Sequence, residues 1–166
     1  MKTPDYFYAT FPTSFGAFSV ATDAGGAVVA TAFGGRAALH RRCGPGHLVA
    51  DNTRTAGART QLRDYLAGRR RTFDLPLAPE GTTFQQSVWT ALRKIPLGET
   101  RSYGDVARQL GSSPRAVGRA NATNPICVIV PCHRVIGADG TMTGFAFGEK
   151  TKRRLLALEG APAFRV

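Results

Sequence analysis

Hydrophobic and polar positions in the first part of the chain predict short β-strands. Three runs rich in aromatic and β-branched residues occupy residues 6–11, 17–22 and 27–33. Stretches rich in Pro, Ser, Thr, Asp and Gly separate these runs, at residues 12–14 and 23–26. Short strands joined by such turn signals predict an antiparallel meander.

The pattern then becomes less regular before it turns helical. Residues 34–52 have mixed composition and predict a loop that contains a helical turn over residues 36–41. An apolar stripe at helical spacing predicts a helix over residues 55–67, with Gly68 just beyond its end. Residues 73–77 predict one further strand.

A linker at Ala78-Pro79-Glu80-Gly81 divides the chain into two expected domains, residues 1–80 and 81–166. Beyond this linker, apolar residues recur at the spacing of helices. Thr83 and Gln86 predict a capping box, and an apolar stripe containing Trp89 predicts a helix over residues 84–94. At this spacing Trp89 is expected in the core rather than on a nucleic acid.

Two shorter helices follow. Ser102 predicts the start of a helix to residue 110, and Ser113 with Pro114 predicts another over residues 114–123. Two helices around a Gly-containing turn are typical of a helix-turn-helix, although an ordinary helical hairpin has the same pattern. The second helix favours DNA binding, because Arg115 and Arg119 project from its first half. We expect its small residues to form a face that approaches a duplex closely: Ala116, Gly118, Ala120 and Ala122.

An apolar run over residues 126–130 predicts a buried strand that Pro131 ends. Cys132 follows at once, in good position for a nucleophile. A cysteine reacts as the thiolate and needs a base or a positive field, which His133 and Arg134 can supply. His133 can serve Cys132 only if the chain turns here or a water bridges them. The alternative is a buried structural cysteine beside a surface His-Arg pair.

The charge of the chain indicates a polyanionic partner. Among 166 residues, Lys and Arg number 22 against 11 Asp and Glu, giving +11 and a pI near 10.6. Nucleic acid fits better than an anionic membrane surface, since no long basic amphipathic helix is predicted. No apolar run approaches the roughly 20 residues of a membrane span, and no secretory signal is visible, so we expect a cytoplasmic protein with reduced cysteines.

No metal or cofactor is expected. The three cysteines are too few for a disulfide framework and form no paired CxxC motif. His40, Cys43 and His47 cluster in the sequence, but they have no obvious fourth ligand, and we interpret them as surface residues.

Three features together resemble the O6-alkylguanine-DNA alkyltransferase family. They are the pentapeptide Pro131-Cys132-His133-Arg134-Val135, Asn124 eight positions before the cysteine, and the sequence Leu-Leu-Ala-Leu-Glu-Gly that ends at Gly160. The likeness covers residues 81–160, about half the chain. It implies an α+β fold with a ribonuclease H-like α/β N-terminal lobe and a mostly helical C-terminal lobe. The latter would contain a winged-helix-like helix-turn-helix.

The resemblance also implies the activity. The alkyl group, chiefly methyl, would move from O6-alkylguanine in DNA, and also from O4-methylthymine, to Cys132 after base flipping. Transfer would be direct, stoichiometric and irreversible, with no cofactor. Double-stranded DNA would be bound through the minor groove by a monomer, and clustering on DNA is left open.

Site residues carry over by position. The implied catalytic residues are Cys132, His133 as base, Glu159 as its orienter, Asn124 as a brace for the turn, and Tyr103 as a hydrogen-bond donor to the purine. The implied DNA-binding residues are Ser102, Arg115, Ala116, Gly118 and Arg119. The implied base pocket comprises Tyr103, Val135, Phe145, Ala146 and Phe147.

The loop over residues 143–148 departs from the family pattern. Phe145 keeps the usual aromatic position, but Ala146 and Phe147 replace a commoner pair of small residues. We expect Phe147 to narrow the pocket and favour methyl over bulkier groups. Two other functions stay open: a non-enzymatic sensor of alkylated bases, and a helix-turn-helix regulator with a redox-sensing thiol.

Overall fold

The computed structural model describes residues 2–142 and 144–162, and the chain divides into two compact units, residues 1–80 and 81–166. Both units combine helices with strands, so the α+β class is confirmed. The first unit contains β1 (Asp5–Thr13), β2 (Gly16–Thr22), β3 (Val28–Phe33), α1 (Arg36–Cys43), β4 (His47–Ala50) and α2 (Ala56–Leu66). The second contains α3 (Thr83–Arg93), β5 (Arg101–Ser102), α4 (Tyr103–Leu110), α5 (Pro114–Ala122), the 3₁₀ turn η1 (Cys132–Arg134), β6 (Val135–Ile136) and α6 (Glu149–Leu158).

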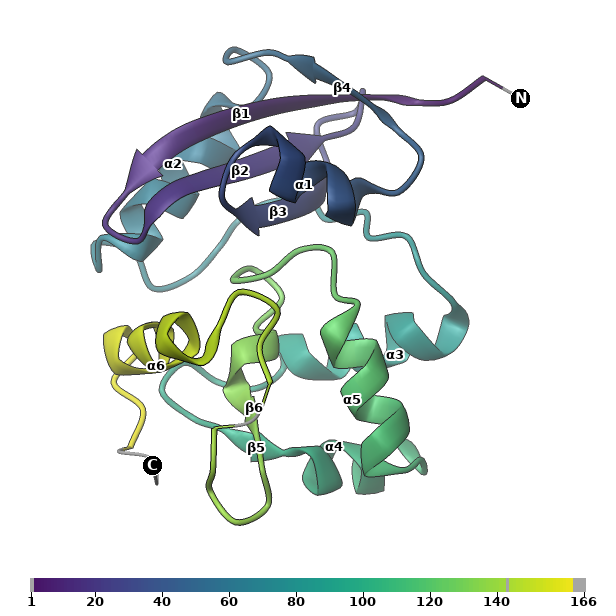
Figure 1. The fold of residues 1–166 in the computed structure, drawn as a ribbon, viewed down its shortest axis with the longest axis vertical. Helices are drawn as coiled ribbons and strands as arrows, with labels where there is room; N and C mark the ends of the chain where they lie inside the picture. The colour runs from purple at the N-terminus through teal and green to yellow at the C-terminus, as the bar shows by residue number, and fades with distance from the viewer. Residues whose placement is uncertain (1, 143, 163–166) are drawn as a thin grey trace. The chain divides into compact units, whose positions relative to one another are not determined.

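The first unit is built on a four-stranded sheet in the order β3-β2-β1-β4. β1 and β2 pair antiparallel, as do β2 and β3, which confirms the predicted meander. Helices α1 and α2 pack on the sheet, and Figure 1 shows α1 in front of the strands and α2 behind them. Covering both faces explains why nearly every residue of β3 is buried rather than every second one.

The prediction of a loop over residues 34–52 is wrong in part. The segment contains a complete helix, α1, and the strand β4, which pairs parallel with β1 at the sheet edge. Only Leu48 of β4 is buried. With one buried side chain among four residues, β4 shows no alternation of apolar and polar residues by which the sequence could predict it. Long-range parallel pairing decides the structure here.

Other elements of the first unit lie close to expectation. The helix predicted over residues 55–67 is α2, and Gly68 follows it with the expected positive φ of 77°. The predicted strand over residues 73–77 is wrong, because the segment makes only an isolated parallel bridge between Leu77 and Val28. No described helix has the length and apolar character needed to cross a membrane.

In the second unit, α3 is present as predicted, but its capping box lies one residue earlier. The Thr82 hydroxyl oxygen accepts from the Gln85 N–H, and the Gln85 side-chain oxygen accepts from the Thr82 N–H. In the sequence either Thr82 or Thr83 could act as the cap, and in the structure Thr82 is the cap residue. Trp89 is 2% exposed and donates its indole N–H to the Ala120 carbonyl at 2.8 Å, which confirms its place in the core and ties α3 to α5.

The predicted helix-turn-helix consists of α4 and α5. Ser102 forms a capping box with Asp105 at the start of α4, and Ser113 caps α5 with Pro114 in the first position. Gly111 ends α4 with φ 63° and ψ 39°, a left-handed conformation that glycine adopts without steric cost. Local signals therefore define both ends of this motif.

The predicted strand over residues 126–130 is wrong, although its burial is correct. These residues form a compact turn in which Val128 has a φ of 72°. Asn124 explains the difference. Its side-chain oxygen accepts from the Ile126 N–H at 3.0 Å, and its amide donates to the Val130 carbonyl at 2.9 Å. The buried backbone is thus satisfied locally rather than by a neighbouring strand.

Candidate active site

Cys132, His133 and Arg134 form the 3₁₀ turn η1 directly after Pro131. The turn removes the strand geometry that would send neighbouring side chains to opposite faces. Cys132 is 6% exposed and His133 is fully buried. The surface His-Arg pair considered as an alternative is therefore not what the structure shows, because Arg134 is buried as well.

His133 contacts a buried carboxylate. Its Nε2 lies 2.9 Å from Oε2 of Glu159, the C-cap residue of α6. Arg134 binds the same carboxylate through two hydrogen bonds, from Nε to Oε1 at 2.9 Å and from Nη2 to Oε2 at 3.1 Å. A third bond from Arg134 Nη1 reaches the Ile95 carbonyl at 2.7 Å.

The cluster keeps Glu159 ionised. Burial is the largest influence on its pKa and raises it, but hydrogen bonds and charges from His133 and Arg134 together outweigh burial. The net effect lowers the pKa of Glu159 from 4.5 to about 2. On the far side of the imidazole, His133 Nδ1 is buried and has no hydrogen-bond partner within the described part of the chain.

The turn before Cys132 is held under local strain. A β-branched residue with positive φ, as at Val128, is rare and costs roughly 1–3 kcal/mol. The two hydrogen bonds of Asn124 and the burial of Val128 hold this conformation. Asn124 thus contacts the segment leading to Cys132, where the sequence places it.

Lys152 is a residue that sequence reasoning missed. It is fully buried, and its ammonium donates to the Val135 carbonyl at 2.7 Å. Burial lowers its pKa to about 8, against opposing attraction from Cys132 and Glu149. The signal was present: Lys152 lies three, four and seven residues before Leu155, Leu156 and Glu159, on the same buried helix face.

Asn121 is a second missed residue. It lies on the buried face of α5, and its amide N–H donates to the Cys132 carbonyl at 3.3 Å. The partner is an acceptor, so the amide nitrogen has to face it and Oδ1 is left buried without a partner in the described structure. The helix-turn-helix is thus connected directly to the backbone of the turn that contains Cys132.

A short parallel pairing brings Tyr103 toward the same region. β5 pairs with β6 so that Arg101 opposes Val135 and Ser102 opposes Ile136. Tyr103 follows Ser102 at the start of α4 and is half-buried. Its ring lies against α5, 3.9 Å from where a side chain at Gly118 would begin. The oxygen of Ser102 accepts the helix cap hydrogen bond, so only its hydroxyl hydrogen remains for a phosphate.

The predicted small-residue face of α5 is wrong as a single face. Ala120 is buried at 3% exposure, while Ala122 is exposed. Residues two apart on a helix do not share a face, whereas residues four apart do. Arg115 and Arg119 are four apart and both exposed, with the half-buried Ala116 and Gly118 between them.

The remaining predicted pocket residues belong to β6 and to the loop that precedes α6. Val135 is fully buried and offers its carbonyl, which already accepts from Lys152. The rings of Phe145 and Phe147 contact edge to face with centroids 5.7 Å apart, and Ala146 between them is exposed. Thr143, in the same loop, lies outside the described residues.

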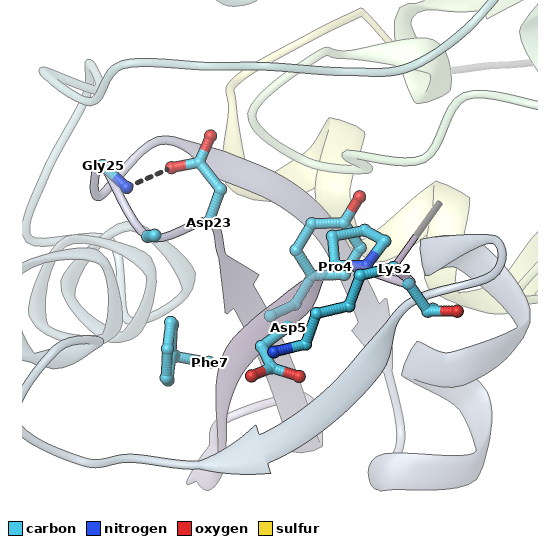
Figure 2. A pocket seen from close by; sticks show the side chains of 9 residues that line it. Lys2, Pro4, Asp5, Phe7, Asp23 and Gly25 are labelled. Atoms are coloured by element: carbon cyan, nitrogen blue, oxygen red, sulfur yellow. Dashed lines mark hydrogen bonds between the residues drawn. The ribbon is translucent and has the colours of Figure 1, made fainter.

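The first unit offers little chemistry by comparison. His40 and His47 are exposed, but Cys43 is buried, which corrects its interpretation as a surface residue, and burial raises the pKa of its thiol to about 11. Across the described residues, no group of three or more His, Cys, Asp or Glu residues could hold a metal ion. Figure 2 shows a hollow beside Asp5 and Asp23, where Asp23 accepts from the Gly25 N–H at 3.0 Å and serves as a turn former.

Comparison with known families agrees with this division of chemistry. The model of the 6-O-methylguanine DNA methyltransferase ribonuclease-like domain matches residues 6–79. The model of the DNA binding domain of the same family matches residues 83–161, the unit that contains the buried cluster.

Individual relatives are similar over most of the chain. The methylated-DNA--protein-cysteine methyltransferase of Methanosarcina acetivorans is 58% identical over 106 residues, 63% of this chain and 68% of that protein. The protein of the same description from Mycobacterium tuberculosis is 53% identical over 119 residues, 70% and 72% of the two chains. A crystal structure of Mycobacterium tuberculosis OGT in complex with DNA superimposes with a TM-score of 0.82 at 43% identity, covering 95% of this chain and 96% of that one. The chain therefore belongs to the 6-O-methylguanine DNA methyltransferase family.

Proposed function

We propose that this protein repairs DNA by moving an alkyl group from O6 of guanine to Sγ of Cys132, once per molecule. Family membership supports alkyl transfer in DNA repair. The structural observation that carries the proposal is the contact of 2.9 Å between His133 and the ionised Glu159, in the turn that contains Cys132. It supports Nδ1 of His133, rather than Nε2, as the base.

The tautomer of His133 follows from the chemistry of its partner. An ionised carboxylate has no hydrogen to donate, so Nε2 of His133 carries the proton in this contact. In the neutral imidazole, Nδ1 then holds a lone pair, and no described protein group occupies it. Nδ1 is therefore the proton acceptor for Cys132, acting through one water molecule.

The step itself is a single displacement. The thiol proton passes through the water to Nδ1, and the thiolate attacks the alkyl carbon. The S–C bond forms as the C–O6 bond breaks, and the electron pair stays on guanine. In the net balance guanine takes up the proton, assisted at N3 by the Tyr103 hydroxyl. The product is a thioether on Cys132, so each molecule acts once.

The exposed side of α5 supports a role in extruding the base. A base inside a duplex cannot reach a buried sulfur, so it has to be flipped out. Arg115 is exposed at the start of α5 and would fill the gap left in the stack. Arg119 would contact phosphate, and Ala116 and Gly118 would allow close approach through the minor groove. One relative, Mycobacterium tuberculosis OGT, has been solved with DNA.

The proposed base pocket uses backbone and aromatic groups. Tyr103, the carbonyl of Val135, and Phe145 would surround the flipped base, with the Ala146 N–H donating to O6. The ring of Phe147 contacts the ring of Phe145 and would leave less room in the pocket, which supports a preference for methyl over bulkier groups. O4-methylthymine presents the same type of methyl ether and is a further proposed substrate.

Peptide mass spectrometry tests the transfer directly. After mixing with duplex DNA that carries one O6-methylguanine, the Cys132 peptide should gain about 14 Da, the mass of a methyl group that replaces the thiol hydrogen. The peptide of Cys43 serves as an internal control and should stay unchanged, and fragmentation of the peptide that contains both Cys127 and Cys132 should place the gain on Cys132. Cys132→Ala should abolish the gain and keep lesion binding. Binding without any gain in the unsubstituted protein would instead indicate the sensor, and indifference to the lesion would indicate the regulator.

Replacing Arg115 separates base flipping from chemistry. Arg115→Ala should slow transfer from duplex DNA by on the order of 10- to 100-fold, because unstacking a base costs a few kcal/mol. Reaction with free O6-methylguanine base should change less than about twofold, since nothing has to be unstacked. Arg119→Ala is the matched control and should weaken DNA binding without slowing transfer at saturating DNA. Equal losses on duplex and free base would remove Arg115 from the flipping role.

Acid titration tests the charge on which the relay depends. Glu159 has its pKa lowered to about 2, so its contribution to stability is fully present above its ordinary value of 4.5 and is lost as pH falls toward 2. The stability advantage of the unsubstituted protein over Glu159→Gln should shrink by about 3 kcal/mol over that range. Urea unfolding at a series of pH values measures it, with the exposed Glu149→Gln as control. An advantage that stays constant with pH would mean that folding does not lower the pKa of Glu159.

A further inference from the structure

The guanidinium of Arg134 makes more protein hydrogen bonds than a surface charge would need. Its guanidinium makes two hydrogen bonds to Glu159 and one to the Ile95 carbonyl, just beyond the end of α3. The side chain is 10% exposed and that of Glu159 is 1% exposed. The planar fork of arginine therefore fixes both oxygens of the carboxylate in one orientation.

One carboxylate oxygen connects Arg134 to His133. Oε2 of Glu159 accepts from Arg134 Nη2 at 3.1 Å and lies 2.9 Å from His133 Nε2. A rotation of the carboxylate that broke the arginine bonds would also move the acceptor of His133. Stability alone is a weak explanation for such a pair, because two charges removed from water gain little net energy over apolar residues of similar size.

The charge of Arg134 also affects the proton balance. Without it, the buried carboxylate would face an imidazole with no fixed counter-charge, and either Glu159 or His133 would hold an extra proton. An imidazole that is already protonated cannot accept the thiol proton. The other charged or titratable groups around the cluster are Cys132 in η1, Lys152 and Glu149 on α6, and the exposed Arg93 and Lys94 at the end of α3.

We propose that Arg134 is a positioning residue of the transfer reaction, which holds Glu159 ionised and oriented so that His133 stays a neutral base for Cys132. The inference rests on the proposed function and deepens it. Arg134 touches neither substrate nor sulfur in this role, and it acts entirely through Glu159.

A double-mutant cycle tests whether Arg134 acts through Glu159. Arg134→Gln should slow single-turnover methyl transfer on the order of 10-fold and move the acidic limb of its pH profile up by about one unit. Arg134→Lys retains the charge and should leave the acidic limb of the pH profile in place. Its transfer rate should still fall, because lysine cannot bind both carboxylate oxygens as the guanidinium does. In a Glu159→Gln background, either substitution should change the rate less than about twofold. The exposed Arg93→Ala is the control of equal charge change and should behave like the unsubstituted protein.

The cycle also covers variants that fail to fold. The Arg134→Gln/Glu159→Gln double variant lacks both charges of the ion pair, so neither is left without its partner. If Arg134→Gln alone does not fold, the comparison of Arg134→Lys in the unsubstituted and Glu159→Gln backgrounds provides the test. The rate of Cys132 alkylation by iodoacetamide against pH, followed by peptide mass spectrometry, provides a readout without DNA. If the unsubstituted protein alkylates but does not take methyl from DNA, the proposed function fails. Equal losses in both backgrounds, or a pH profile that Arg134→Gln leaves unmoved, would overturn the role of Arg134.

Discussion

The second unit depends on a carboxylate that is almost completely removed from water. An isolated buried carboxylate would be protonated or would destabilise the fold, so Glu159 requires partners. Those partners come from η1, through His133 and Arg134, and Arg134 in turn binds the end of α3. Binding this one charge thus connects three elements, and one of its partners is His133, the residue next to Cys132 in the chain.

Polar residues on otherwise apolar helix faces build the rest of the site. Lys152 on α6 and Glu159 at its C-cap lie on the same buried face as Leu155 and Leu156. On α5, Asn121 lies one turn beyond Val117 on the face that packs inward, and its amide meets the Cys132 carbonyl. Each helix therefore uses one side both for packing and for hydrogen bonds to the segment around Cys132. On α5 the opposite side remains exposed, with Arg115 and Arg119 available to a polyanion.

Local signals in the sequence predicted much of this architecture. The caps at Ser102 and Ser113, the meander and the buried Trp89 all follow from residues close in sequence. The failures have two different physical causes. Strand β4 exists only through pairing with β1, and the run before Pro131 turns because the side chain of Asn124 satisfies its backbone. A long-range pairing thus decided the first structure, and a local side-chain contact decided the second.

Burial of charge was the hardest property to predict. In a chain with a charge of +11, a surface position for Arg134 was one of two open alternatives and Lys152 was not singled out, yet both are buried and bonded. Helical spacing could have revealed Lys152, because it shares the stripe of Leu155 and Leu156. Nothing in the sequence alone placed Arg134 against Glu159, since that contact spans 25 residues and depends on how α6 returns to η1.

The protonation state of the His133 imidazole tests the central claim most directly. Nitrogen-15 NMR of the reduced protein, labelled at histidine and assigned with His133→Gln, distinguishes the two neutral tautomers and the cation. At neutral pH the account predicts a neutral ring with the proton on Nε2 and a lone pair on Nδ1. A proton on Nδ1, in either the other tautomer or the cation, would contradict it, because no base would then face Cys132.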